Sequence, residues 1–173
     1  MPKAMHRSLT RAPGKDRSIF DHSAVSLWEE DISGLRLLLR EWQSRKIPDL
    51  RSYLLAHPVQ VRKGLKAIRV VDVNEATLAL YEAKSRKDLL GPLDIRLDAA
   101  SLNDFIELFM AVAEGRGRVE QESTALTLGG KTLSVLVRAI IPAERDPYPY
   151  MLVNVVDITR LKELEKKLGQ ELS

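Results

Sequence analysis

The stretch TLSVLVRAIIPAERDPYPYMLVNVVDITR, residues 132–160, decides the fold. It contains two runs rich in β-branched residues, 132–141 and 148–157, with a proline-containing segment between them. In the first run every second residue is apolar: Leu133, Val135, Val137, Ala139 and Ile141. Such alternation predicts neighbouring antiparallel strands that place one face against a core.

Three more segments extend this predicted sheet. Residues 119–128 read as a strand, and Gly129-Gly130 predicts a two-residue hairpin turn that joins it to 132–141. Short segments at 24–29 and 68–73 have the composition of two further strands.

Helical spacing of apolar residues appears between these strands. The longest predicted helix begins at Ser101 and ends at Gly115, and its apolar stripe consists of Leu102, Phe105, Ile106, Phe109 and Ala113. Residues 32–67 predict further helices, the first with Ser33 as its N-cap. Asn74 is predicted to cap a short helix at 75–81. The mixture predicts an α+β domain.

The last segment has a pattern of its own. From Leu161, leucines recur at Leu164 and Leu168, and charged residues surround them. This spacing spans little more than one heptad and predicts the start of a coiled-coil helix at 158–173.

Composition and charge exclude several classes of protein. The chain has 173 residues, no cysteine and no run of eighteen apolar residues, so we expect no disulfide, cysteine-ligated metal or membrane span. The net charge of +3 is uneven: residues 1–18 carry five basic side chains and one acidic one, whereas the rest carry 22 basic and 23 acidic ones. We therefore predict a disordered basic tail at 1–18, a cytoplasmic location and no nucleic-acid partner. A weaker alternative makes the tail a nucleic-acid anchor.

Four short motifs resemble those of PAS sensory domains, the small modules of bacterial signalling proteins. They are Val70–Ala76 at a strand that runs into an Asn-capped helix, the turn at 85–91, the hairpin at 129–131, and Asp157-Ile158-Thr159-Arg160 at the end of the last strand. The resemblance covers about 19–168 and implies a sensory domain at 19–157 with a PAS-like antiparallel sheet, flanking helices and a C-terminal exit helix. A helical insertion at 32–67 departs from the usual pattern.

The resemblance also implies site residues. A PAS ligand would lie between the sheet and the helix at 101–114, and the candidate lining residues are Phe105, Phe109, Val135, Val137 and Val153. The same residues fit a plain hydrophobic core. Asp157 and Thr159 would couple the sheet to the exit helix, although the same pair also fits a simple N-cap. Asn74 fits a helix cap better than a ligand contact.

No cofactor is indicated by the sequence. A cysteinyl-flavin adduct needs a cysteine, and haem-binding PAS domains usually carry a histidine on the long helix, but 101–114 contains none. His6, His22 and His57 are too scattered for a metal site. If the interior holds a ligand, we expect it to be small and largely apolar.

Two functions remain open at this stage. The first is a non-catalytic sensory or relay module of a histidine kinase or cyclic-dinucleotide enzyme, covalently linked to that output domain. It would form a homodimer through the exit helix, and the insertion is a further candidate interface. The alternative is a small cone-shaped enzyme or carrier that uses a buried acid and Tyr148 or Tyr150 around an apolar pocket.

Overall fold

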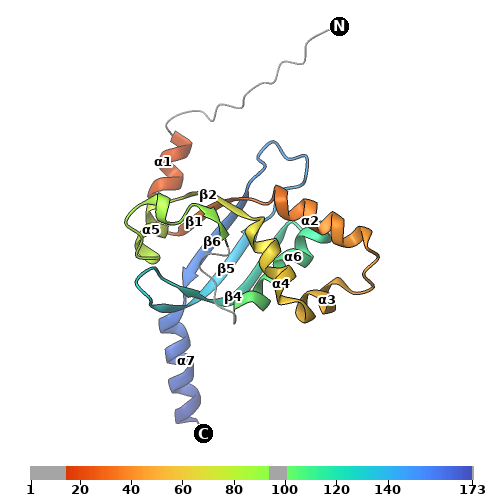
Figure 1. The fold of residues 1–173 in the computed structure, drawn as a ribbon. Coiled ribbons are helices and arrows are strands. Elements are labelled where there is room, and N and C mark those ends of the chain that lie inside the picture. Colours follow the sequence, from red (N-terminus) through yellow and green to blue (C-terminus); the bar gives the residue numbers. More distant parts are fainter. Residues whose placement is uncertain (1–14, 94–100, 173) are drawn as a thin grey trace.

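A computed structural model describes residues 15–93 and 101–172 of the chain. Its centre is one antiparallel sheet with strand order β3-β2-β1-β6-β5-β4 (Figure 1). The strands are β1 (Ser26–Asp31), β2 (Arg69–Val73), β3 (Gly91–Pro92), β4 (Arg118–Leu126), β5 (Thr132–Ile140) and β6 (Met151–Asp157). Together with the helices below, this sheet confirms the predicted α+β class.

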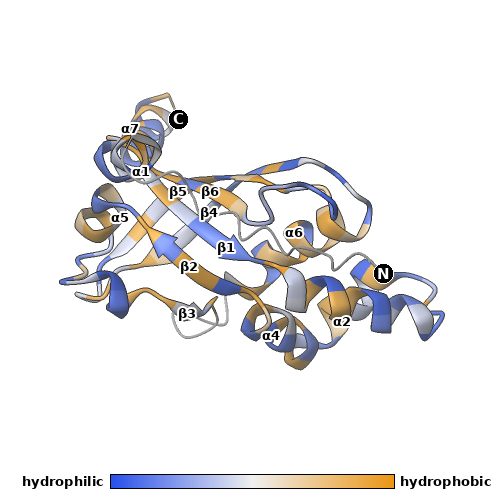
Figure 2. Cartoon of the chain, turned by 90° about the horizontal axis from the view of Figure 1, so that it is seen from above, coloured by the Kyte–Doolittle hydropathy of each residue, from blue (hydrophilic) through white to orange (hydrophobic). Residues whose placement is uncertain are grey.

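The helices gather toward two ends of this sheet. They are α1 (Lys15–His22), α2 (Ser33–Ser44), α3 (Leu50–Ala56), α4 (Pro58–Lys66), α5 (Glu75–Leu80), α6 (Asp104–Ala113) and α7 (Thr159–Glu171), with short 3₁₀ turns η1 (Arg86–Asp88) and η3 (Ser101–Asn103). Figures 1 and 2 show α2, α4 and α6 toward one end and α1, α5 and α7 toward the other. The helices α2, α3 and α4 form the segment inserted between β1 and β2, and each of them contacts α6.

The register of the sheet explains how alternate residues reach one face. Val137 lies opposite Gln121 on β4 and Val155 on β6, and Trp28 on β1 lies opposite Val153. Because side chains alternate along each strand, these partners point to the same side of the sheet. The predicted pairing of 132–141 with 148–157 is therefore confirmed.

Strand β6 begins later than predicted, at Met151 rather than at Tyr148. Pro147 and Pro149 have no N–H to donate to a ladder, and the Tyr148 N–H donates to Asp146 Oδ1 at 2.9 Å. This local turn holds the chain out of the sheet until Met151.

The predicted two-residue hairpin is wrong by one residue. The Thr127 N–H donates to the Lys131 carbonyl at 2.8 Å, so three residues, 128–130, form the loop. Gly130 has a φ of 87°, a left-handed conformation that glycine adopts without strain. The sequence correctly indicated a glycine turn but not which glycine takes the left-handed position.

Two other boundaries differ from the prediction. Helix α1 begins at Lys15 and thus overlaps the end of the predicted basic tail, while 1–14 lie outside the described residues. Ser33 is not the N-cap of α2; Ile32 occupies that position, and Asp31 Oδ1 accepts a hydrogen bond from the Ser33 N–H at 2.9 Å.

Helix α6 lies between the insertion and the sheet. On the insertion side, Phe109 is fully buried and its ring centroid lies 6.4 Å from that of Trp42. A Cβ atom at Gly64 on α4 would lie 2.5 Å from the Phe109 ring, so only glycine permits this close approach. The insertion is therefore packed tightly onto α6.

Candidate ligand cavity and exit-helix junction

A cavity of about 120 Å³ lies between α6 and the inner face of the sheet. Four of the five predicted lining residues contribute to it: Phe105, Val135, Val137 and Val153. They come from α6, β5 and β6, and the strand register brings them to one face. Their part in binding a ligand stays a prediction.

Phe109 does not line the cavity, contrary to the prediction. It is one helical turn beyond Phe105, but its ring points toward Trp42 and Gly64 in the insertion. Phe105 and Phe109 belong to one broad apolar stripe of α6. At Phe105 this stripe borders the cavity beside the sheet, and at Phe109 it packs against the insertion. The insertion at 32–67 thus takes one side of the helix, and the sequence did not reveal this.

Glu30 is the lining residue that the sequence analysis missed. Glu30 lies on β1, is only 4% exposed and forms part of the cavity wall. Burial raises the pKa of its carboxyl to about 8. The strand predicted at 24–29 ends one residue before Glu30. Because β1 runs on to Asp31, alternation with Trp28 could have placed Glu30 on the inner face.

Other polar side chains in the cavity wall are already hydrogen-bonded. Gln121 Nε2 on β4 donates to the Asp104 carbonyl at 2.5 Å, and the Ser123 hydroxyl donates to the Asp104 carboxylate. Trp28 Nε1 donates to Ser26 Oγ at 3.1 Å, and its ring meets Tyr81 edge-on at 5.0 Å. These contacts fix the walls of the cavity.

The exit helix is hydrogen-bonded to the sheet at its first residue. Thr159 Oγ1 accepts from the Ser134 N–H of β5 at 3.0 Å and donates to Asp157 Oδ1 at 2.6 Å. The Ile158 N–H also donates to the Ser134 carbonyl at 2.8 Å. The hydrogen bonds from Thr159 lower the pKa of Asp157, so the carboxylate stays ionised and keeps accepting them.

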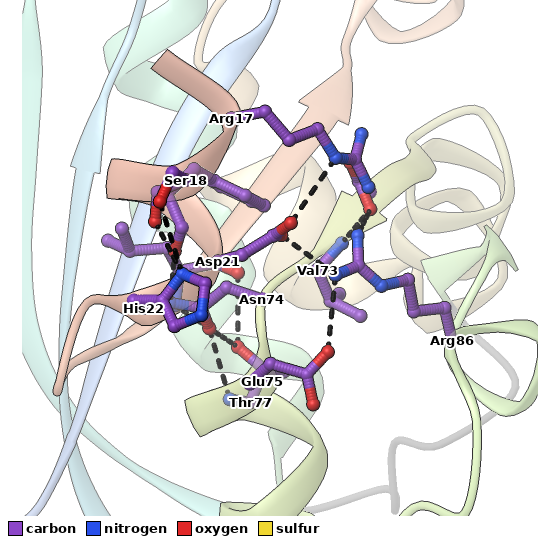
Figure 3. A network of polar contacts seen from close by, with 12 residues as sticks. Arg17, Ser18, Asp21, His22, Val73, Asn74, Glu75, Thr77 and Arg86 are labelled. Atoms are coloured by element: carbon purple, nitrogen blue, oxygen red, sulfur yellow. Dashed lines mark hydrogen bonds and ion pairs between the residues drawn. The ribbon is translucent and has the colours of Figure 1, made fainter. Parts of the chain in front are cut away.

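Asn74 joins three segments at the other end of the sheet (Figure 3). Its Oδ1 accepts from the Thr77 N–H at 3.1 Å, which is the predicted helix cap, and from the Leu27 N–H at 3.0 Å. Its Nδ2 donates to the Phe20 and Val25 carbonyls at 3.0 and 2.8 Å. The amide group is thus occupied by α1, β1 and α5, and this favours the cap over a ligand contact.

An ion-pair network also fastens α1 to this end of the sheet (Figure 3). Arg86 contacts Asp21 at 2.7 Å and Asp72 at 3.0 Å, and Arg17 contacts Asp72 at 2.9 Å. Burial alone would raise the pKa of Asp21, but the hydrogen bond and the positive charge of Arg86 hold it below its ordinary value. Helix α1 is therefore connected both through Asn74 and through Arg86.

The described part of the chain shows no metal centre. No group of three or more His, Asp or Glu side chains in 15–93 and 101–172 could hold an ion. His22 and His57 instead bond to the carbonyls of Ser18 and Tyr53, each within its own helical turn. His6 lies outside the described residues. No helix in these ranges is long and apolar enough to cross a bilayer.

Tyr148 and Tyr150, which the enzyme alternative would use, lie in the segment before β6. Their rings contact each other edge-on at 5.8 Å. Neither belongs to the cavity wall beside Glu30. The cavity therefore has a buried acid, Glu30, as the enzyme alternative requires, but the two tyrosines of that alternative lie outside its wall.

Of the comparisons with known proteins, the one with solved structures identifies the fold. No protein-family model matches the sequence, and no curated protein is significantly similar to it. Among solved structures, the PAS domain of a Colwellia psychrerythraea protein matches with a TM-score of 0.55 and 14% identity, over 84% of this chain and 95% of that one. A Rhodobacter sphaeroides LOV protein matches with a TM-score of 0.54 and 17% identity, over 83% of this chain and 66% of that one.

A third match extends over almost the whole chain. An RNA-binding light-oxygen-voltage receptor matches with a TM-score of 0.61 and 13% identity, over 99% of this chain but only 40% of the receptor. Identities this low establish the fold alone. Together with the six-stranded antiparallel sheet, these matches show that the chain has the PAS fold.

Proposed function

We propose that the chain is a sensory or relay module of a larger bacterial signalling protein, either a histidine kinase or a cyclic-dinucleotide enzyme. The module changes state through ligand binding or dimer rearrangement and passes that change to a linked output domain through α7. The fragment itself carries out no catalysis in this proposal, and it acts in the cytoplasm.

The observation that supports this proposal is the junction at Thr159. Its hydroxyl bonds to Ser134 on β5, and the next residue of β5, Val135, lines the cavity. A change in the cavity wall thus has a short path of two neighbouring residues to the start of α7.

The exposed face of α7 supports a dimer as the active form. Leu161, Leu164 and Leu168 are 52%, 48% and 58% exposed, although leucine at these spacings normally packs against a partner. Figure 1 shows that α7 points away from the sheet, where a second copy could pair with it. We therefore propose a homodimer through α7, with the insertion as the alternative interface.

Substitution of the joint tests the relay. Thr159→Val keeps the shape of the side chain and removes its hydroxyl, so the hydrogen bonds to Ser134 and Asp157 are lost. In a fusion of the chain to a histidine kinase through α7, we expect a folded protein whose kinase no longer responds to the module. Thr132→Val, at the exposed start of the same strand β5, is the matched control. A fully responsive Thr159→Val fusion would contradict the proposal.

Substitution of the leucine face tests the dimer. Leu164→Ser in α7 should weaken self-association in sedimentation experiments, whereas Leu37→Ser on the insertion should leave it unchanged. The opposite result would place the interface on the insertion.

A further inference from the structure

The Glu30 side chain is placed like a ligand-recognition group. It lies two residues after Trp28 on β1, opposite Met151 on β6, and both neighbours line the cavity with it. The strand alternation directs its carboxyl into the cavity, away from solvent. A side chain this polar is rarely buried in an apolar wall without a partner.

Its carboxyl has no such partner in the described part of the chain. No hydrogen bond or ion pair joins it to residues 15–93 or 101–172, whereas Gln121, Ser123 and Trp28 in the same wall are hydrogen-bonded elsewhere. Buried polar groups are nearly always satisfied by protein, water or ligand. Among the described residues, none therefore competes with a molecule in the cavity for a hydrogen bond to the Glu30 carboxyl.

The surrounding titratable groups leave the carboxyl uncharged near neutral pH. In the described cavity wall, Tyr81 is the other titratable side chain, and no lysine or arginine contributes. Glu29 and Asp31 flank Glu30 on β1 but alternate to the other face, and Asp104 on α6 binds Ser123. On the flanking strands, Val70 and Met151 lie opposite Glu30. Burial therefore dominates and raises its pKa to about 8.

A protonated carboxyl offers one O–H donor and one carbonyl acceptor. An uncharged acceptor can pair with that O–H without bringing a charge into the apolar cavity. The cavity of about 120 Å³ is close to the size of the cavity, about 150 Å³, that admits a benzene molecule. Both size and polarity thus limit what can bind.

We propose that Glu30 selects, for this cavity, a small, uncharged and largely apolar molecule with a carbonyl-type hydrogen-bond acceptor. This inference rests on the proposed sensory function for its biological meaning, because the bound molecule would be the signal. Binding itself can be measured on the chain alone, without any output domain.

Ring compounds of matched size provide the probes. Cyclohexanone carries the acceptor, methylcyclohexane lacks it, and cyclohexylamine carries a positive charge near neutral pH. The two tryptophan indole N–H signals in NMR report binding, because Trp28 lines the cavity whereas Trp42 packs against Phe109 outside it. We expect cyclohexanone to shift the Trp28 signal and leave the Trp42 signal in place.

Two variants test the role of the carboxyl. Glu30→Leu should weaken cyclohexanone binding about fivefold, the loss of one hydrogen bond, and leave methylcyclohexane binding unweakened. Glu30→Gln keeps an N–H donor at every pH. In the wild type, affinity for cyclohexanone should be constant below about pH 7 and fall about tenfold per pH unit well above pH 8, while in Glu30→Gln it stays flat.

Three results would overturn the inference. One is the absence of any Trp28 shift with cyclohexanone. Another is an unchanged pH profile in Glu30→Gln. The third is tighter binding of cyclohexylamine, with affinity that rises toward pH 8, because that would make Glu30 an anionic partner of amines. None of these results would contradict the relay through Thr159, because the fusion experiment tests that relay separately.

Discussion

The two sides of α6 differ in how they are filled. Toward the insertion, Phe109 packs against Trp42 and against the backbone of Gly64. Toward the sheet, Phe105 faces a wall of short side chains such as Val137, together with Glu30. One helix thus separates a close-packed core from a cavity.

This difference shows which side of α6 is closely packed and which side borders a space. On the insertion side the rings of Trp42 and Phe109 pack together, whereas on the sheet side a cavity lies between Phe105 and residues such as Val135, Val137 and Ala139. A cavity persists only where the surrounding structure holds its walls apart. We infer that the insertion anchors α6 and thereby keeps the cavity open.

The largest expected effect on stability comes from replacing each of the two phenylalanines of α6 by alanine, one at a time. Phe109→Ala should lower the free energy of unfolding by about 3–5 kcal/mol, because it opens a void in a packed region. Phe105→Ala should lower it by only about 1–2 kcal/mol, because this side chain is partly exposed and already borders a cavity. Urea unfolding of both variants measures the contrast, and equal losses would show that the two sides are packed alike.

A second prediction concerns the pH dependence of stability on the cavity side. The Glu30 carboxyl has a pKa of about 8 when folded and 4.5 as a free side chain. Between these values the folded protein binds one more proton than the unfolded chain, so stability falls as pH rises, by up to about 1.4 kcal/mol per pH unit.

The variant Glu30→Gln removes this slope. The free energy of unfolding of Glu30→Gln minus that of the wild type should therefore increase steadily from pH 5 to pH 8. The carboxylates of Asp21 and Asp157, whose pKa values are lowered, are present in both proteins and cancel from the difference. A constant difference across this range would mean that Glu30 is ionised in the folded protein.

The smallest expected effect comes from adding one methylene group to each side. Val137→Leu extends into the cavity and should change stability by less than about 1 kcal/mol, or stabilise slightly. Val61→Leu in the insertion, where the side chain is buried, should destabilise by about 1–3 kcal/mol. Thermal unfolding compares them, and a destabilising Val137→Leu would indicate that the cavity is smaller than the structure shows.

The sequence predicted the sheet well because its pattern is local. Alternation along 132–141 depends only on neighbouring residues, and so do the cap at Asn74 and the turn at Asp157 and Thr159. The hairpin at Gly130 was less predictable, because two adjacent glycines can both adopt the left-handed conformation and the strand register selects one of them.

The cavity could be predicted only in part. Hydrophobic residues have the same pattern whether they fill a core or leave a space, so Phe105 and Phe109 were indistinguishable in sequence. Their separation depends on the insertion, whose contact with α6 is a long-range packing event. Glu30 was missed because the predicted strand stopped at residue 29, whereas β1 continues to Asp31.

The 13 residues of α7 give its junction with the sheet a geometric consequence. At 1.5 Å per residue the helix extends about 20 Å from Thr159, so a tilt of about 10° at its first turn displaces the far end by about 3 Å. A displacement that is small at the Ser134 hydrogen bonds thus becomes comparable to the width of a side chain at the far end.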